Sequence, residues 1–175
     1  MIDLFKAFVD IALWRKGPQH LPASIVLLAI VVALDGVLTL IFTHGVDPAQ
    51  KHLSLRILLE VVFSLGWIWL LLAVFRRPER FVQTATAIFG TSVLLTPLMF
   101  GMQGVLGNLA DGSLLAVPMR LGLRTLYVWY LLINAHIVRS ALEVNLFMAI
   151  ILTVLGTICV YALATQVLAL AMPAA

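Results

Sequence analysis

Long apolar stretches separated by short polar turns make up most of this chain. They fall at residues 23–43, 53–75, 81–100, 119–139 and 145–172. A helix needs about 20 mainly apolar residues to cross the roughly 30 Å hydrocarbon core of a bilayer, and all five stretches reach that length. We therefore predict an all-α membrane protein, built as a bundle of five transmembrane helices.

Two of these segments are less regular than the others. In the fourth, only 14 residues separate Arg124 from Arg139, and they are uncharged if His136 is neutral. That run is about 21 Å of helix, so the two arginines must snorkel or the helix must lie behind its neighbours. Pro97 predicts a kink in the third stretch. The glycine-rich residues 101–118 are either a loop lying on the membrane or a shallow re-entrant segment.

The pattern before the first span is that of an amphipathic helix lying on the membrane. Apolar residues recur at helical spacing between Leu4 and Ala12, while Asp3, Lys6 and Asp10 fall largely elsewhere on the helical wheel. An aromatic residue and two cations follow, as is typical of a headgroup boundary. We predict an interfacial unit at 1–22 and a transmembrane domain at 23–175. The residues expected to contact the membrane surface are Phe5, Phe8, Trp14, Arg15 and Lys16.

Composition and charge agree with a membrane protein. The 175 residues are 63% hydrophobic and 11% charged, whereas soluble domains contain about 25% charged residues. The net charge of +3 comes from basic residues beside apolar segments, so we expect lipid and no nucleic acid as a partner. The single Cys159 excludes an intrachain disulfide. Asp3 and Asp10 argue against a cleaved signal peptide, so the first span is expected to be retained.

The distribution of cations predicts an orientation. With five spans, the N-terminal side of the membrane would have seven cations and the opposite side four. The positive-inside rule then places the N-terminus in the cytoplasm and the C-terminus on the other side. The seven are Lys6, Arg15, Lys16, Arg76, Arg77, Arg80 and Arg139, and the four are Lys51, Arg56, Arg120 and Arg124.

Charged residues inside the spans are the main candidates for a site, because an intramembrane charge normally has a partner or a function. Arg56 and Glu60 are four residues apart on one helix and can pair locally, and Asp35 can pair with Arg124. A polar cavity open to the outer face is the alternative, with proton exchange at a carboxylate or an anionic headgroup held by arginines. The predicted ionic cluster consists of Asp35, Arg56, Glu60, Arg120 and Arg124.

Other polar residues have a simpler interpretation. The small hydroxyl residues of the third span, with Gly90, are typical of close helix packing. His44 and His52 share an outer turn, where a solvated loop is favoured over a two-histidine metal site. Nothing supplies a nucleophile, a metal shell or an oxyanion site, so we expect no enzyme, no cofactor and no metal.

Two segments resemble the Yip (Ypt-interacting protein) family. They are FVDIALWRKGPQHLPAS, from Phe8 to Ser24, and RFVQTATAIFGTSVLLTPL, from Arg80 to Leu98. The first is similar to that family's pre-membrane segment and the second to its third span, and five spans match its layout. The Asp-Leu-Tyr-Gly-Pro motif of eukaryotic members is absent, so the chain looks like the short bacterial members and a Rab-GTPase-binding role is not expected. The resemblance implies a non-enzymatic integral membrane protein acting in membrane organisation or trafficking, and it transfers no functional residue.

Three functions remain open on the sequence. The first is a Yip-like adaptor of a bacterial inner membrane, acting through helix and lipid contacts, with protein partners or further copies of the chain. The second is a small transporter or permease component with a polar cavity lined by Asp35, Glu60 and Arg124. The third is an accessory subunit of a larger membrane complex.

Overall fold

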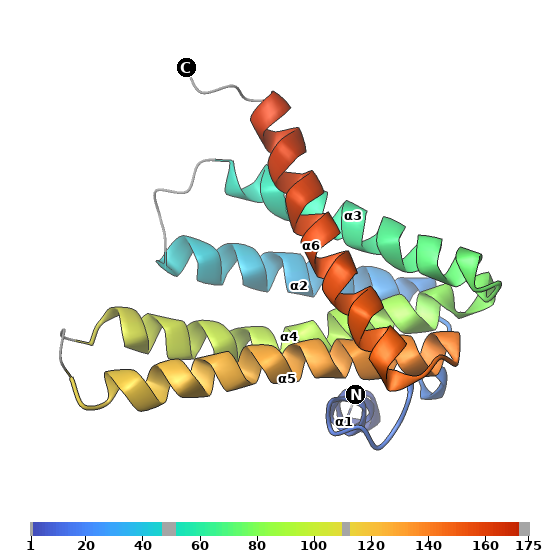
Figure 1. Cartoon of the computed structure of the whole chain (residues 1–175), viewed down its shortest axis with the longest axis horizontal. Coiled ribbons are helices and arrows are strands. Elements are labelled where there is room, and N and C mark those ends of the chain that lie inside the picture. The colour runs from blue at the N-terminus through green and yellow to red at the C-terminus, as the bar shows by residue number, and fades with distance from the viewer. Residues whose placement is uncertain (1, 47–51, 110–112, 172–175) are drawn as a thin grey trace.

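The computed structural model describes residues 2–46, 52–109 and 113–171 as a set of helices, with no strand among them. Figure 1 shows their arrangement. The α-helices are α1 (Ile2–Ala12), α2 (Ile25–Val46), α3 (Leu53–Val74), α4 (Phe81–Gly107), α5 (Ala116–Leu142) and α6 (Leu146–Ala171). Two short 3₁₀ helices, η1 (Pro18–His20) and η2 (Pro78–Arg80), lie in the connections.

Five helices, α2 to α6, are long and apolar enough to cross a membrane, which confirms that part of the prediction. They contain 22 to 27 residues, or about 33–40 Å of helix. The third and fourth are longer than predicted, because α4 continues to Gly107 and α5 begins at Ala116. Residues 101–107 are therefore helical, and both the loop and the re-entrant interpretation were wrong there. A helix satisfies every backbone polar group internally, which an apolar environment requires.

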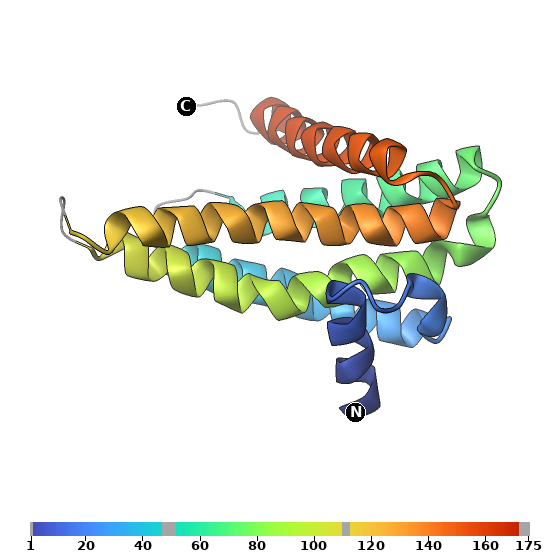
Figure 2. The ribbon, with the colours of Figure 1, turned by 60° about the horizontal axis from the view of Figure 1, so that its bottom comes forward.

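The five long helices pack against one another in a closed ring. α4 packs against α2 on one side and α5 on the other, α6 packs against α5 and α3, and α3 completes the ring against α2. Figures 1 and 2 show α4 and α5 running side by side, with α6 crossing obliquely. The buried face of α4 consists largely of small residues, including Ala85, Thr86, Ala87, Gly90 and Thr91. These allow close approach of neighbouring helices, as the sequence indicated.

Two hydroxyl groups on this face bond to their own helix. Thr86 Oγ1 donates to the Val82 carbonyl at 2.7 Å and Thr91 Oγ1 to the Ala87 carbonyl at 2.9 Å. Farther along, Pro97 lies inside α4, where its missing N–H removes one backbone hydrogen bond. In Figure 2 the two halves of α4 run in different directions, in agreement with the predicted kink.

The N-terminal helix α1 docks on the bundle through its apolar residues. Ile11 is fully buried, and the Phe8 ring lies directly on the backbone of Gly90 in α4. Phe8 is 6% exposed, whereas Phe5 is 58% exposed. The assignment of Phe8 to the membrane surface was therefore wrong, because its ring fills the space that Gly90 leaves open. Phe5 stays available for such a contact.

The turn after α1 has the geometry of a Schellman motif, with Trp14 in the left-handed region at φ 60°. The Trp14 N–H donates to the Ile11 carbonyl at 3.0 Å, and the Arg15 N–H donates to the Asp10 carbonyl at 2.8 Å. Lys16 Nζ lies 2.9 Å from Asp10 Oδ2. Hydrogen bonding to this ammonium lowers the pKa of the Asp10 carboxyl. Backbone hydrogen bonds and an ion pair therefore both stabilise the turn.

Three contacts fasten this segment to the long helices. Trp14 stacks on His136 of α5 at 5.3 Å between ring centroids. His136 Nε2 donates to the Lys16 carbonyl at 3.2 Å, and Trp129 Nε1 donates to the Ala12 carbonyl at 3.3 Å. Trp14 thus packs on protein with one face while remaining partly exposed. Apolar residues of this segment, from Leu4 to Leu21, share one hydrophobic core with the long helices.

Candidate functional site: a central polar cavity

A cavity of about 640 Å³ lies inside the ring, and all five long helices contribute to its wall. This volume is in the range of small-molecule binding sites. Most of the wall is aliphatic or aromatic. The polar and charged residues that line it are Thr39, Thr43, Arg56, Glu60, Ser64, Thr84, Tyr127, Tyr130, Asn134, Thr153, Thr157 and Tyr161.

A smaller chamber of about 230 Å³ adjoins this cavity and contains Asp35 and Ser92 in its wall. Glu60 and Tyr130 line both spaces, together with Thr39, Ser64 and Ile88. We call the two spaces the main cavity and the side chamber. The sequence placed Asp35 deep in a span, and the structure shows that its side chain meets the same polar space as Glu60.

The local ion pair predicted on the second span is confirmed. Arg56 Nε donates to Glu60 Oε1 at 2.9 Å, one helical turn apart on α3. The guanidinium carbon of Arg56 also lies 5.3 Å from the centre of the Tyr161 ring on α6, a cation–π geometry. The pair thus joins α3 to α6 at the wall of the main cavity.

The predicted pairing of Asp35 with Arg124 was wrong. The four ion pairs found among the described residues involve neither side chain, and Arg120 also takes part in none. Asp35 lies near the middle of α2, whereas Arg120 and Arg124 lie in the first turns of α5 and are exposed. α4 packs between these two helices, so only Arg56 and Glu60 of the predicted cluster meet as an ion pair.

Three oxygen atoms around this space have no hydrogen-bond partner among the described residues: Asp35 Oδ1, Thr84 Oγ1 and Asn134 Oδ1. Thr84 is 2% and Asn134 8% exposed, and both line the main cavity. The Asn134 amide nitrogen donates to the Tyr130 carbonyl at 3.0 Å. The unpartnered atom of this side chain is therefore its amide oxygen. Buried oxygens without partners cost free energy, and a bound ligand with N–H or O–H groups would satisfy them.

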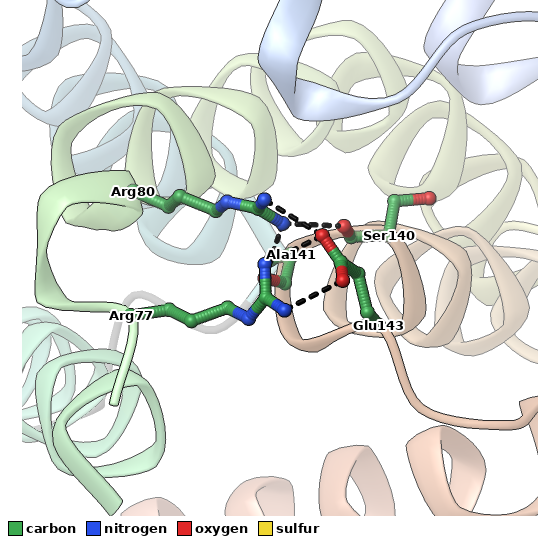
Figure 3. A network of polar contacts seen from close by, with 5 residues as sticks. All are labelled: Arg77, Arg80, Ser140, Ala141 and Glu143. Carbon is green, nitrogen blue, oxygen red and sulfur yellow. Dashed lines mark hydrogen bonds and ion pairs between the residues drawn. The ribbon is translucent and has the colours of Figure 1, made fainter. Parts of the chain in front are cut away.

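A cluster of Arg77, Arg80 and Glu143 lies beside the end of the cavity next to η2, as Figure 3 shows. Arg77 Nη1 and Nη2 donate to the two Glu143 carboxylate oxygens at 2.5 and 2.6 Å. Arg80 Nη2 donates to Glu143 Oε1 at 2.7 Å, and its Nη1 donates to the Ala141 carbonyl at 3.0 Å. Ala141 lines the main cavity, so this arginine–glutamate cluster ties η2 to the C-terminal end of α5 next to the cavity wall.

The arginine–glutamate cluster predicts a pH effect on stability. Hydrogen bonds from Arg80 and Arg77 lower the pKa of Glu143 below its ordinary value of 4.5. A carboxylate with a lowered pKa stabilises the fold above its unfolded-state pKa, and this contribution is lost as the pH falls through the folded-state pKa. We therefore expect Glu143→Gln to lower the melting temperature by a constant amount between pH 7 and 5. The difference should shrink below about pH 4.5, as measured by thermal unfolding in detergent.

Glu79→Gln is the matched control, because Glu79 is exposed on η2 and takes part in none of the ion pairs found among the described residues. It should leave the melting curve unchanged at every pH. A difference between wild type and Glu143→Gln that persists unchanged to pH 3 would contradict the assignment.

Sequence reasoning missed several parts of the site. It gave no site role to Asn134 or Tyr130, and it placed the hydroxyl residues of the third span, to which Thr84 belongs, only in a packing face. It assigned no role to Glu143. A stripe at Tyr127, Tyr130, Asn134, Val138 and Ala141 has helical spacing, but a sequence does not say whether such a stripe faces a core, lipid or a cavity.

Comparisons with known proteins add no assignment. A scan against models of protein families, a search of curated proteins and a search of solved structures found no match to this chain. The resemblance to the Yip family stays a prediction from two short segments.

Proposed function

We propose that this chain is a non-enzymatic integral membrane protein that binds a small solute in its central cavity, as a permease or a component of one. The observation that carries the proposal is the main cavity of about 640 Å³, walled by all five long helices and lined by buried oxygens that have no partner within residues 2–46, 52–109 and 113–171. A packed structural bundle would fill such a space with side chains. Ligand sites in helical membrane proteins lie between the helices in this way.

The shape of the bundle supports access from one end. In Figure 1 the ends of α3, α4, α5 and α6 near η2 lie closer together than their opposite ends. The arginine–glutamate cluster lies at the converging end, and α1 packs against α4 and α5. The opposite end has Arg56, Thr43 and Tyr161 in the cavity wall. We infer that solute enters there, while the arginine–glutamate cluster keeps the other end shut.

The proposal includes an orientation. Arg76, Arg77 and Arg80 follow the end of α3, and Arg15 and Lys16 follow α1. The positive-inside rule favours the cytoplasm for the end of the bundle at which these five cations lie. The membrane would be a bacterial inner membrane. Solute access would then be from the non-cytoplasmic side, where the C-terminus would also lie.

Blocking the main cavity should weaken binding. Gly156 lines it, and a side chain added there would run into the indole of Trp67, which also lines it. We expect Gly156→Leu to weaken binding at least tenfold, measured by calorimetry on protein in nanodiscs. The probes are 2-phenylethylammonium, 2-phenylethanol and 3-phenylpropanoate, which share an apolar body and differ in charge.

Gly66→Leu is the matched control, because Gly66 lies on α3 with open space around it. Its affinity for each probe should equal that of wild type. Circular dichroism and gel filtration would show that both variants remain folded. The proposal fails if none of the three probes binds, or if Gly156→Leu binds them as well as wild type does.

A second candidate, a Yip-like membrane-organising adaptor, is favoured by a different observation. Phe5, Leu13 and Trp14 are large apolar residues exposed on the N-terminal segment. Such side chains insert into the boundary between headgroups and acyl chains. In that case the cavity is incidental, and the probe experiment would show no saturable binding.

A further inference from the structure

We infer that the ligand of this site is a singly charged organic cation, an amine with an apolar body, whose ammonium group enters the side chamber beside Asp35. This inference rests on the proposed function and specifies the chemical class of its solute. It follows from the charges of the lining, from the unpartnered oxygens and from the aromatic residues around the space.

The charged lining has one acidic group in excess. Asp35 and Glu60 are acidic, and Arg56 is the one basic residue that lines either space among the described residues. Arg56 is already engaged, at 2.9 Å from Glu60 and over the Tyr161 ring. Asp35 Oδ1 is buried without a hydrogen-bond partner in the described part of the chain. A monocation beside Asp35 would make the site neutral, which surroundings of low dielectric constant strongly favour.

Two further unpartnered oxygens lie in the wall of the main cavity and outside that of the side chamber. Asn134 Oδ1 can only accept hydrogen bonds, and Thr84 Oγ1 is the second unpartnered buried oxygen in the main cavity wall. Both side chains are more than nine-tenths buried. An ammonium group has three N–H donors and no acceptor, which matches the unpartnered Asp35 Oδ1 in the wall of the side chamber. A carboxylate would offer only acceptors.

The two spaces suit the two parts of an amphipathic amine. The side chamber, at about 230 Å³, has Asp35, Thr39, Ser64 and Ser92 in its wall and accommodates the charged group. The main cavity, at about 640 Å³, offers Trp67, Tyr127 and Tyr161 to the apolar body. Aromatic side chains offer an apolar body a large contact surface. Tyr130 lines both spaces and would lie beside the ligand at their junction.

The test compares the same three probes on wild-type protein in nanodiscs. We expect 2-phenylethylammonium to bind at least tenfold more tightly than 2-phenylethanol, and 3-phenylpropanoate to bind most weakly. Asp35→Asn keeps the shape of the side chain and should remove the preference for the cation, with at least a tenfold loss of its affinity. Its affinity for 2-phenylethanol should change little.

Glu79→Gln is the charge-matched control, because it removes one negative charge from the exposed η2 and should leave all three affinities unchanged. Equal or tighter binding of the alcohol or the carboxylate would overturn the inference while leaving the proposed solute site standing. Absence of binding by all three probes would overturn both. The ranking of probes uses wild-type protein alone, so it decides the question even if Asp35→Asn does not fold.

Discussion

Replacing Gly90 with leucine is expected to detach α1 from the bundle and to lower the free energy of unfolding by about 2–3 kcal/mol. A side chain at this position would overlap the Phe8 ring. That ring is buried, so it can move only if α1 moves with it. The change should appear as a lower melting temperature and as faster tryptic cleavage after Lys6, Arg15 and Lys16.

Gly101→Leu is the matched control on the same helix, because Gly101 has open space around its α-carbon. It should be neutral or slightly stabilising, since leucine has the higher helix propensity. The double variant Phe8→Ala with Gly90→Leu should be more stable than the sum of the single changes predicts, because the leucine can occupy the space of the missing ring. Strict additivity would contradict the proposed contact.

Replacing Arg56 with alanine is expected to be the most damaging change among the charged residues of the long helices. It leaves Glu60 without its cation, near a chamber that already contains Asp35. Breaking a fully buried ion pair costs about 3–5 kcal/mol, and an exposed pair contributes at most about 1 kcal/mol. The side chains of Arg56 and Glu60 are 26% and 31% exposed, so we expect a loss near 2 kcal/mol, between these limits. Unfolding in mixed detergent would measure it.

The control is Arg124→Ala, on a residue that is exposed and belongs to none of the four ion pairs in the described ranges. Its effect should stay within about 0.5 kcal/mol. Replacing Arg56 and Glu60 together by leucine should restore most of the stability, because no unpaired charge remains. If Arg124→Ala costs as much as Arg56→Ala, the structural assignment of these charges is wrong.

Features that depend on neighbours in sequence were predictable. Five long apolar segments gave five helices long enough to cross a membrane, because bilayer thickness sets the length of such helices. The pair of Arg56 and Glu60 was predictable because residues four apart meet on any helix. The packing face around Gly90 followed from its small residues.

Helix limits were less certain where the local signal was weak. Residues 101–107 contain three glycines, which have low helix propensity and favoured a loop. In the structure these residues continue α4. The requirement to satisfy backbone hydrogen bonds in apolar surroundings outweighs propensity there.

The sequence by itself determined the all-helical fold, the number of long apolar helices and the ion pair of Arg56 with Glu60 inside α3. The tertiary structure decided which residues face one another: Phe8 on Gly90, Glu143 with Arg77 and Arg80, and Asp35 at a polar chamber instead of beside Arg124. The physical reason is that helices apolar on all sides have no strongly preferred face. Their rotation and choice of neighbours, and therefore the cavity between them, are set by packing between residues far apart in the chain.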